Sequence, residues 1–408
     1  MTDRNDKTEQ KYFIRILRDY VHQSKSEIPN HGIHLHRLYL YAKDQDLCGI
    51  VYYQCKDIPG FNSSVLHFLS DGFLTDAYLS VNTDYAMHEI EAQLADNQIE
   101  YLPFKGIIIR NSYPHPELRT MGDRDILIHP YDCKKADQIM QNLGYNRMID
   151  NHAVWTYTKP HLMFEVHNRM FYEELTTQTD YKNYFDAVWK TAQKTDNGYC
   201  YYPDSKIHFI YMMVHTAKHI INKGIGFRAF LDMTFFCLNT LPVAVHKDEW
   251  RWIEEELKRI ELYDFTVRCF SLCEKWFEVQ MPFVRSELNE EFCEYVQNKV
   301  FRDGLFGLEN DDNEASRTAK EVYKSGTYYM TAVRLTLYKL FPPYHDLQLV
   351  PWYSWIDGKP WLLPAAWIYR WFYCTNHKFR HGFNLLSEPF IKKKQVIKRE
   401  SYLDQWGL

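Results

Sequence analysis

The chain has 408 residues, 46% of them hydrophobic and 25% charged, and its formal net charge at pH 7 is −5. This composition is typical of a globular protein, and the length allows roughly two or three domains at about 150 residues each. The negative balance excludes a general attraction of the whole chain to nucleic acid, while it leaves room for a local basic patch.

Nine cysteines are scattered along the chain without a CxxC pair. Their odd number and irregular spacing favour reduced, mostly buried thiols, as in a cytosolic protein. The first residues are polar and lack the apolar core of a signal peptide, and no run approaches the roughly 18–20 apolar residues that cross a bilayer. We therefore expect a cytoplasmic protein without a membrane span, whose oligomeric state the sequence leaves open.

The first part of the chain, residues 7–99, has apolar side chains at helical spacing. We expect helices over 12–21, 35–55 and 74–97, the second of them weakened in its middle by Gly49.

The pattern changes to short apolar runs at residue 99. We expect strands at 99–104 and 125–128, the start of a helix at 105–110, an amphipathic helix at 131–143 before Gly144, and a hairpin formed by 153–157 and 162–166. Residues 99–170 would then form a small α/β core.

Helical periodicity returns from residue 204 onward. Helices are expected at 205–222, 226–239, 248–260, 263–279 and 289–300, followed by an acidic loop at 309–314, a further helix and irregular structure at 342–364. The sequence thus predicts an α+β fold, with a small mixed-sheet core embedded in a mainly α-helical chain. The expected division is an N-terminal helical region 1–98, a core 99–200 and a C-terminal helical region 201–408.

Two carboxylates, Asp123 and Asp125, stand two residues apart at the start of the run 125–128. On a strand such residues point to the same face, so both carboxylates aim at one point. Like charges held this close need a neutralising partner, and the usual one is a hard cation such as Mg²⁺, which binds carboxylates together with substrate phosphates. The pair indicates metal-dependent phosphoryl or nucleotidyl transfer, and its alternative is two surface acids at a strand edge.

Glu165 is a third candidate because it lies inside the apolar strand 162–166, where an unpaired charge is costly. It would complete a metal site or accept a proton from an attacking hydroxyl. The alternative is a glutamate held by a salt bridge or at a sheet edge.

Lys105, Gly106 and Arg119 are candidate phosphate contacts. A glycine at a strand-to-helix turn lets the backbone approach a phosphate, and a lysine beside it supplies a point charge. Arg119, four residues before Asp123, would bridge phosphate oxygens or brace the carboxylates, unless it forms a structural ion pair.

These motifs resemble those of a family of uncharacterised bacterial nucleotidyltransferases. The resemblance rests on Lys105-Gly106, on Tyr113-Pro114-His115-Pro116-Glu117-Leu118-Arg119, on Asp123-x-Asp125-Ile126-Leu127-Ile128 and on Phe164-Glu165-Val166-His167. The arrangement is also similar to toxin-type nucleotidyltransferases with KGG…R-[ST]-x-D-x-D, and both groups belong to the polymerase β-like superfamily. More loosely, the resemblance extends over most of the chain, including 215–219 and 362–367.

The resemblance implies a metal-dependent enzyme that moves an NMP from an NTP such as ATP to an acceptor hydroxyl and releases pyrophosphate. Asp123 and Asp125 would hold Mg²⁺ or Mn²⁺ against the triphosphate, and Glu165 would help to hold a second ion. Lys105, Gly106 and Arg119 would contact the nucleotide. A non-catalytic member of the same fold that binds a nucleotide or a partner is the alternative.

Two positions depart from the family pattern. The superfamily usually has Gly-Gly or Gly-Ser at the turn, whereas Ile107 follows Gly106 here, so the phosphate grip would be weaker or would come mainly from Lys105. Arg124 stands between the two carboxylates, where an apolar residue is more common. It is harmless if it points to the opposite face, and otherwise it would pair with Glu117 or a phosphate.

Three histidines, His208, His215 and His219, fall at i, i+7 and i+11 and form one stripe on an expected helix. The stretch lacks the glutamate of HExxH, which disfavours a zinc hydrolase. His215 and His219, with the neighbouring Lys218, would line the nucleotide or acceptor pocket, or else form a structural polar seam.

Two other charge patterns are less specific. Arg228 and Asp232 are spaced as an i, i+4 pair on one helix. The basic run 392–399 is read as a solvated face, with a polyphosphate or RNA contact as the alternative. The acceptor stays open: a small molecule, a sugar, a peptide, a protein side chain or a tRNA end would each suit such a site, and the base preference is equally unreadable.

Overall fold

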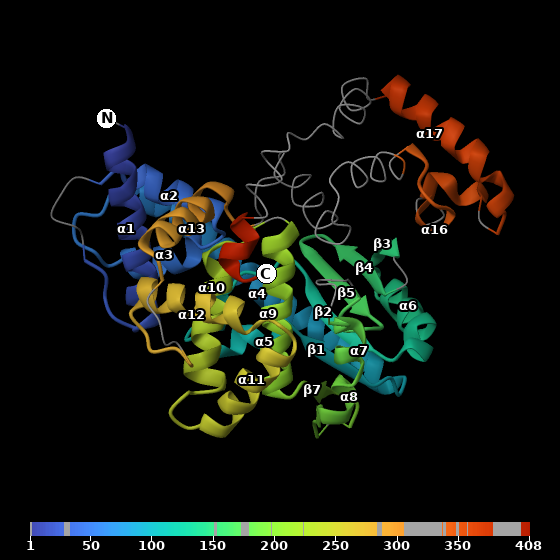
Figure 1. The fold of residues 1–408 in the computed structure, drawn as a ribbon, viewed down its shortest axis with the longest axis horizontal. Coiled ribbons are helices and arrows are strands. Elements are labelled where there is room, and N and C mark those ends of the chain that lie inside the picture. Colours follow the sequence, from blue (N-terminus) through green and yellow to red (C-terminus); the bar gives the residue numbers. More distant parts are fainter. Residues whose placement is uncertain are drawn as a thin grey trace. The chain divides into compact units, whose positions relative to one another are not determined.

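The structure is a computed structural model. It describes residues 2–27, 33–150, 153–172, 179–196, 198–222, 224–283, 288–305, 337, 340–347, 351–356, 358–377 and 401–408. The chain divides into two compact units (Figure 1). The first comprises Met1–Ile220, Gly224–Leu308 and Gly407, and the second comprises Ile221–Lys223, Glu309–Trp406 and Leu408.

The N-terminal helices are α1 (Thr2–Val21), α2 (Leu35–Asp44), α3 (Cys48–Cys55) and α4 (Ser63–Asp96). The helix expected over 35–55 is interrupted between α2 and α3 rather than at Gly49. The buried Gln45 side chain there donates to the Val300 carbonyl and accepts from the Phe227 amide. These contacts to distant segments stabilise the break, and the sequence gives no local sign of them.

The central sheet has the strand order β1-β2-β5-β4-β3. Its strands are β1 (Tyr101–Phe104), β2 (Arg124–Ile128), β3 (Asn146–Asp150), β4 (Val154–Lys159) and β5 (Leu162–His167). The segments between them include α5 (Gly106–Ile109), the 3₁₀ turns η1 (Arg110–Ser112), η2 (Pro116–Leu118) and η3 (Pro130–Asp132), and α6 (Cys133–Asn142). The expected strands and hairpin are present, and β3 is an addition at the sheet edge.

The sheet is mixed because β2 runs antiparallel to β1 and parallel to β5. Side chains of β2 and β5 therefore alternate between two faces. One face, which carries Ile126 and Phe164, packs in a buried core with residues of α4 and α6. On the other face the Phe104 ring lies 5.0 Å from His167 and 5.4 Å from Tyr211 of α9, measured between ring centroids. Asp125, Glu165 and His167 share this second face and thus lie toward helix α9.

The C-terminal part of the first unit is mainly helical. Its elements are α7 (Tyr181–Asp186), α8 (Val188–Thr191), β6 (Gln193–Lys194), β7 (Tyr201–Tyr202), α9 (Ser205–Asn222), α10 (Phe227–Phe235), the π-helical turn η4 (Phe236–Thr240), α11 (Lys247–Arg259), α12 (Tyr263–Phe277) and α13 (Glu290–Asp303). The five helices expected between residues 205 and 300 are present, and α10 is shorter than expected because the π-helical turn replaces its end. The further helix expected after the acidic loop falls on residues of which most lie outside the described part of the chain.

The described elements of the second unit are α16 (Tyr344–Leu347), the 3₁₀ turns η5 (Pro351–Ile356) and η6 (Pro360–Leu362), and α17 (Leu363–His377). In the segment expected to be irregular, 342–364, the described residues form mainly short helical turns before α17. The acidic loop at 309–314 and the basic run at 392–399 lie outside the described residues. No described helix is both long and apolar enough to cross a membrane. The predicted α+β fold is confirmed.

Arg124 lies on the α4 side of the sheet, opposite the face of Asp125. Its side chain is buried, and its Nε and Nη2 donate to the Thr83 hydroxyl of α4 at 3.0 and 2.8 Å. Its Nη1 donates to the Gly122 carbonyl at 3.1 Å. Burial, reinforced by the charge of Arg110, lowers the pKa of Arg124. The residue therefore braces the start of β2 and does not enter the face that carries the carboxylates.

Replacing Thr83 with Val removes the oxygen that accepts two hydrogen bonds from Arg124. The buried guanidinium then loses an acceptor, and we expect the free energy of unfolding to fall by about 1–3 kcal/mol in urea denaturation. Thr75→Val is the matched control, because Thr75 is exposed on α4 and its hydroxyl bonds only within the helix, to the Asp71 carbonyl. Losses of equal size in the two variants would contradict this role of Arg124.

Candidate active site

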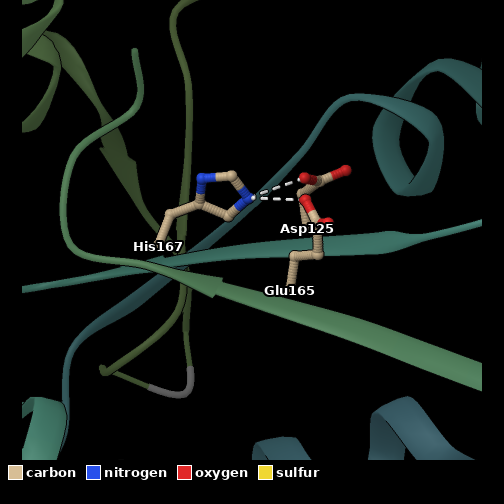
Figure 2. A group of neighbouring side chains, drawn as sticks. All are labelled: Asp125, Glu165 and His167. Atoms are coloured by element: carbon tan, nitrogen blue, oxygen red, sulfur yellow. Dashed lines mark hydrogen bonds and ion pairs between the residues drawn. The ribbon is translucent and has the colours of Figure 1, made fainter. Parts of the chain in front are cut away.

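The centre of the site is set by the pairing of β2 with β5. The register places Asp125 opposite Glu165, and His167 follows Glu165 on the same face. Nε2 of His167 lies 2.8 Å from Asp125 Oδ1 and 3.4 Å from Glu165 Oε2 (Figure 2). One ligand atom from each of the three side chains lies within 4.8 Å of the others. Two carboxylates and an imidazole therefore converge on one point.

Lys105 joins this cluster from the end of β1. Its Nζ lies 2.5 Å from Asp125 Oδ1, and its backbone amide donates to Nε2 of the buried His208 at 3.1 Å. The backbone has φ +53° and ψ −130°, a conformation that costs free energy for a residue with a side chain. The contacts of Lys105 at both ends of the residue hold it in that conformation.

The charges at the centre stabilise one another. Burial alone would raise the pKa of Glu165, but the hydrogen bond to His167 and the charge of Lys105 outweigh it, so that the pKa is lowered. Burial likewise opposes the charged form of Lys105, but Asp125 holds its pKa well above the ordinary value. The surroundings therefore favour the charged forms of both Lys105 and Glu165.

Asp123 stands immediately before β2 and lines the same cavity as Glu165. Its charge acts on Lys105 and on Glu165. It does not belong to the group of three ligand atoms, which contains His167 instead. The assignment of Asp123, Asp125 and Glu165 as the metal ligands stays a prediction.

A cavity of about 310 Å³ opens over this face of the sheet. Its polar lining comes from the β1–α5 turn, the loop before β2, β5, α9 and α10, and comprises Lys105, Arg119, Asp123, Glu165, His167, Tyr172, Tyr211, His215, Thr216, Lys218, His219, Arg228 and Asp232. Every candidate residue of the sequence prediction except the buried Asp125 therefore lines this one cavity.

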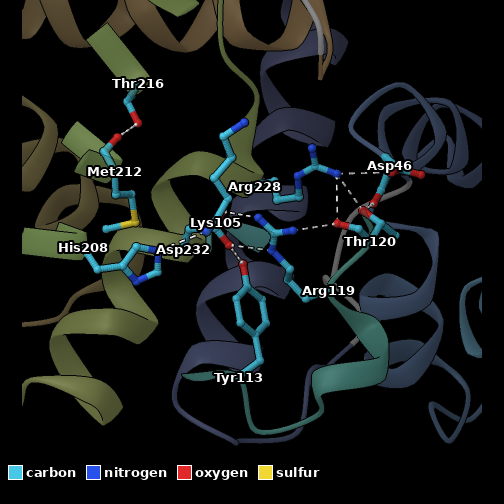
Figure 3. A network of polar contacts seen from close by, with 10 residues as sticks. All are labelled: Asp46, Lys105, Tyr113, Arg119, Thr120, His208, Met212, Thr216, Arg228 and Asp232. Atoms are coloured by element: carbon cyan, nitrogen blue, oxygen red, sulfur yellow. Dashed lines mark hydrogen bonds and ion pairs between the residues drawn. The ribbon is translucent and has the colours of Figure 1, made fainter. Parts of the chain in front are cut away.

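Arg119 is held by Asp232 of α10 in a two-pronged ion pair. Its Nη2 lies 2.8 Å from Asp232 Oδ2 and its Nε lies 3.1 Å from Oδ1 (Figure 3). The Tyr113 hydroxyl donates to the same Oδ1 at 2.7 Å. In this structure Arg119 has the contacts of the structural ion pair that was its alternative reading.

The spacing of Arg228 and Asp232 predicted an ion pair that does not form between these two described residues. Asp232 accepts from Arg119 and Tyr113, whereas Arg228 donates to the carbonyl of Thr120 at 3.1 Å and to its hydroxyl at 3.0 Å. The helical spacing permitted the local pair, and tertiary contacts replaced it.

Gly106 is packed closely by the Arg119 side chain. A Cβ at this position would lie 2.5 Å from Arg119 Nη1 and 3.1 Å from Met121 Sδ. Because Asp232 fixes Arg119, that contact cannot relax freely. A glycine is therefore needed here to admit the guanidinium, a reason that differs from the expected approach of a phosphate to the backbone.

The histidine stripe of α9 divides into two parts. His208 is buried and accepts the Lys105 amide, whereas His215 and His219 line the cavity with ring centroids 4.4 Å apart. Lys218 also lines the cavity, and its Nζ lies 5.5 Å from the centroid of the Tyr172 ring. Burial, together with the charge of His219, lowers the pKa of His215 well below its ordinary value.

Two residues of the site were not selected as candidates from the sequence, and the first is His167. The signal was present, because a residue two positions after Glu165 on a strand shares its face. Tyr211 is a second one: it lines the cavity, and the charges of Lys105 and Asp125 act on its hydroxyl. Its position follows from the packing of α9 on the sheet, which no local pattern indicates.

Replacing Asp232 with Asn leaves the Arg119 guanidinium without its charged partner in a buried setting. We expect the free energy of unfolding to fall by about 3–5 kcal/mol, measured by urea denaturation. Asp248→Asn is the control, because Asp248 is 86% exposed where it pairs with Arg251. It should cost less than about 1 kcal/mol. A loss as small as that of the control would mean that the Arg119 pair contributes little.

Burial lowers the pKa of His208 from 6.5 to about 4. The unfolded chain then takes up a proton at a higher pH than the folded protein, so this contribution to stability is complete above pH 6.5 and is lost as the pH falls toward 4. His208→Gln keeps an acceptor for the Lys105 amide and removes the titration. Between pH 7 and 5 the variant should lose about 2 kcal/mol less than the wild type in urea unfolding. Parallel pH profiles would contradict this.

Comparison with known proteins then identifies the family. A family model described as an uncharacterised nucleotidyltransferase matches residues 31–278, more than half of the chain. Neither the comparison with curated proteins nor that with solved structures gave a significant match. The matched range includes β2, β5, α9 and α10, and thus the walls of the cavity. The resemblance of the motifs is confirmed, and the chain belongs to this uncharacterised nucleotidyltransferase family.

Proposed function

We propose that the protein is a metal-dependent nucleotidyltransferase, which moves an NMP from an NTP to a hydroxyl of an acceptor and releases pyrophosphate. The observation that carries this proposal is the register of β2 and β5, which brings the buried carboxylate of Asp125 beside that of Glu165, and Glu165 lines the cavity. Membership of the family supports the same class of reaction.

The donor set fits a hard divalent cation. Two carboxylates converge here, and Asp123 adds a third from the same cavity; such oxygen donors suit Mg²⁺ or Mn²⁺. We assign the ion to these three carboxylates, and we give His167 the task of orienting Asp125 and Glu165 through its Nε2. When bound, the ion would neutralise phosphate charge and lower the pKa of the attacking hydroxyl.

The residues of the chain have separate tasks in the proposed reaction. The acceptor oxygen forms a bond to the α-phosphorus, the bond to the bridging oxygen of the β-phosphate breaks, and the hydroxyl proton passes to Glu165. We propose that Lys105 moves from Asp125 to the phosphates when the nucleotide binds, because its Nζ has no other described ion-pair partner. Positioning and charge neutralisation then account for most of the rate.

The remaining cavity residues are assigned to substrate binding. We propose that Gly106, Arg119, His215, Lys218 and His219 shape the nucleotide and acceptor pocket, since all of them line it. The acceptor belongs to one of the classes that a hydroxyl nucleophile allows: a small molecule, a sugar, a peptide, a protein side chain or a tRNA end.

We also propose that the reaction takes place in the cytoplasm. The cysteines whose side chains the structure describes are free thiols, as a reducing compartment requires.

One contact favours the alternative, a non-catalytic protein that binds a nucleotide or a partner. Lys105 already neutralises Asp125 at 2.5 Å, so the carboxylates have a cationic partner without a metal. In a binding protein this ion pair would be permanent. In the enzyme it would open when the metal and the nucleotide enter.

Replacing Asp125 with Asn and Glu165 with Gln in one variant should abolish transfer, by roughly 10²–10³-fold or more, because the charges that hold the ion and accept the proton are gone. The assay incubates each labelled NTP with Mg²⁺ and cell extract and follows the label into macromolecules and small molecules. Glu255→Gln, an exposed glutamate of α11, is the control and should retain full activity. Nucleotide binding without transfer in the wild type would support the binding protein instead.

A further inference from the structure

Two of the cations expected at the phosphates are already engaged in this structure. Lys105 contacts Asp125 at 2.5 Å, and Arg119 is paired with Asp232 through two nitrogens. The Arg119 side chain also covers Gly106, where a phosphate was expected to approach the backbone. The turn after β1 therefore offers little free positive charge to a phosphate chain.

Arg228, in the first turn of α10, is differently placed. Its hydrogen bonds all start from Nη1 and reach the carbonyl and hydroxyl of Thr120 and, at 3.5 Å, Oδ2 of Asp46 (Figure 3). Its Nε and Nη2 have no partner among the described residues, and the side chain lines the cavity. Thr120 thus anchors one edge of the guanidinium and leaves the other edge available.

The charge of Arg228 is poorly compensated by the protein. Asp46, its one described ion-pair partner, is 48% exposed and meets it only at 3.5 Å. Burial and the neighbouring Arg119 guanidinium both lower the pKa of Arg228. Lys218 adds a further positive charge to the same cavity. An anion bound at this end would supply the missing negative charge.

We infer that Arg228 forms a phosphate-binding subsite of this cavity, in addition to the contact proposed for Lys105. The planar fork of a guanidinium matches two oxygens of one phosphate. The inference rests on the proposed function, because the phosphate belongs either to the tail of an NTP or to a phosphorylated acceptor. With a volume of about 310 Å³, the cavity is small enough for one such ligand to reach both Arg228 and the carboxylates.

The test is calorimetric titration of the full chain with inorganic tripolyphosphate in the presence of EDTA, so that no metal contributes. We expect the wild type to bind, and Arg228→Gln to bind about tenfold to a hundredfold more weakly, the effect of losing one charged hydrogen-bonding group. Lys105→Gln should lose less than Arg228→Gln. A wild type that does not bind tripolyphosphate, or an Arg228→Gln variant that binds within twofold of it, would overturn the inference.

Two controls separate binding from structure. Arg251→Gln removes the same charge from an exposed position of α11. Thr120→Val removes the hydroxyl that anchors Nη1 but leaves Nε and Nη2 untouched. Both should bind within twofold of the wild type. An equal loss in Thr120→Val and Arg228→Gln would show that Arg228 only supports the loop, and would overturn the subsite.

A measurement on the wild type covers the case in which Arg228→Gln does not fold. Phenylglyoxal modifies accessible arginines, and mass spectrometry of the peptides reports each one. Tripolyphosphate should slow the modification of Arg228 at least fivefold and leave Arg251 unchanged. If Arg228 reacts at the same rate with and without tripolyphosphate, the inference is wrong.

Competition identifies the source of the phosphate. If an NTP displaces tripolyphosphate, the subsite takes the nucleotide tail; if both bind together, it takes a phosphate of the acceptor, and either result supports the subsite.

Failure of this inference is distinct from failure of the proposed function. If Arg228→Gln transfers the nucleotide with an unchanged KM for NTP and for the acceptor, the phosphate subsite is wrong and the proposed enzymatic function stands. If tripolyphosphate binds through Arg228 but the wild type transfers no nucleotide, the subsite stands and the proposed enzymatic function is wrong.

Discussion

The parallel pairing of β2 with β5 is the constraint on which the rest of the site depends. It brings Asp125 and Glu165 side by side on the face of the sheet that borders the cavity, and a slip of one residue would turn one of them to the opposite face. The two charges make the site costly unless they are compensated and hydrogen-bonded. The Lys105 ammonium lies 2.5 Å and the His167 imidazole 2.8 Å from Asp125. The need for a cation at Asp125 also explains the strained backbone of Lys105. Strand β1 ends just before this residue, at the point from which the Lys105 ammonium reaches Asp125.

The cavity walls are fixed by buried polar contacts between segments that are distant in sequence. Arg119 and Tyr113 tie the loop before β2 to Asp232 of α10, and His208 of α9 holds the Lys105 backbone. Such contacts fix geometry more sharply than apolar packing does, since an unpaired buried charge is expensive. The proposed chemistry needs that precision, because phosphoryl transfer depends on placing charges rather than on covalent steps of the protein.

Local patterns predicted most of the fold and the location of the site. Helix α9 was expected with its observed bounds, and the hairpin of β4 and β5 followed from two apolar runs around a turn. Strand β3 was missed because Asn146–Asp150 is mostly polar. It is an edge strand, and β4 is the only strand with which it pairs in the described sheet. The partners of the site residues were harder to predict: Asp232 was assigned to Arg228 by helical spacing, but it pairs with Arg119, more than a hundred residues away. The direction of Arg124 was left open by the sequence, and the structure turns it to the face opposite Asp125, where its partner Thr83 depends on how α4 packs.

The central claim is that the carboxylates of β2 and β5 hold a divalent ion together with a nucleotide. Electron paramagnetic resonance measures it directly, because free Mn²⁺ gives a signal that is lost on binding. The account predicts that the wild type, with a non-hydrolysable NTP analogue, removes about one equivalent of the Mn²⁺ signal or more beyond what the analogue removes alone. The variant that carries both Asp125→Asn and Glu165→Gln should remove none beyond the analogue. Equal loss of signal with the wild type and this variant would contradict the account.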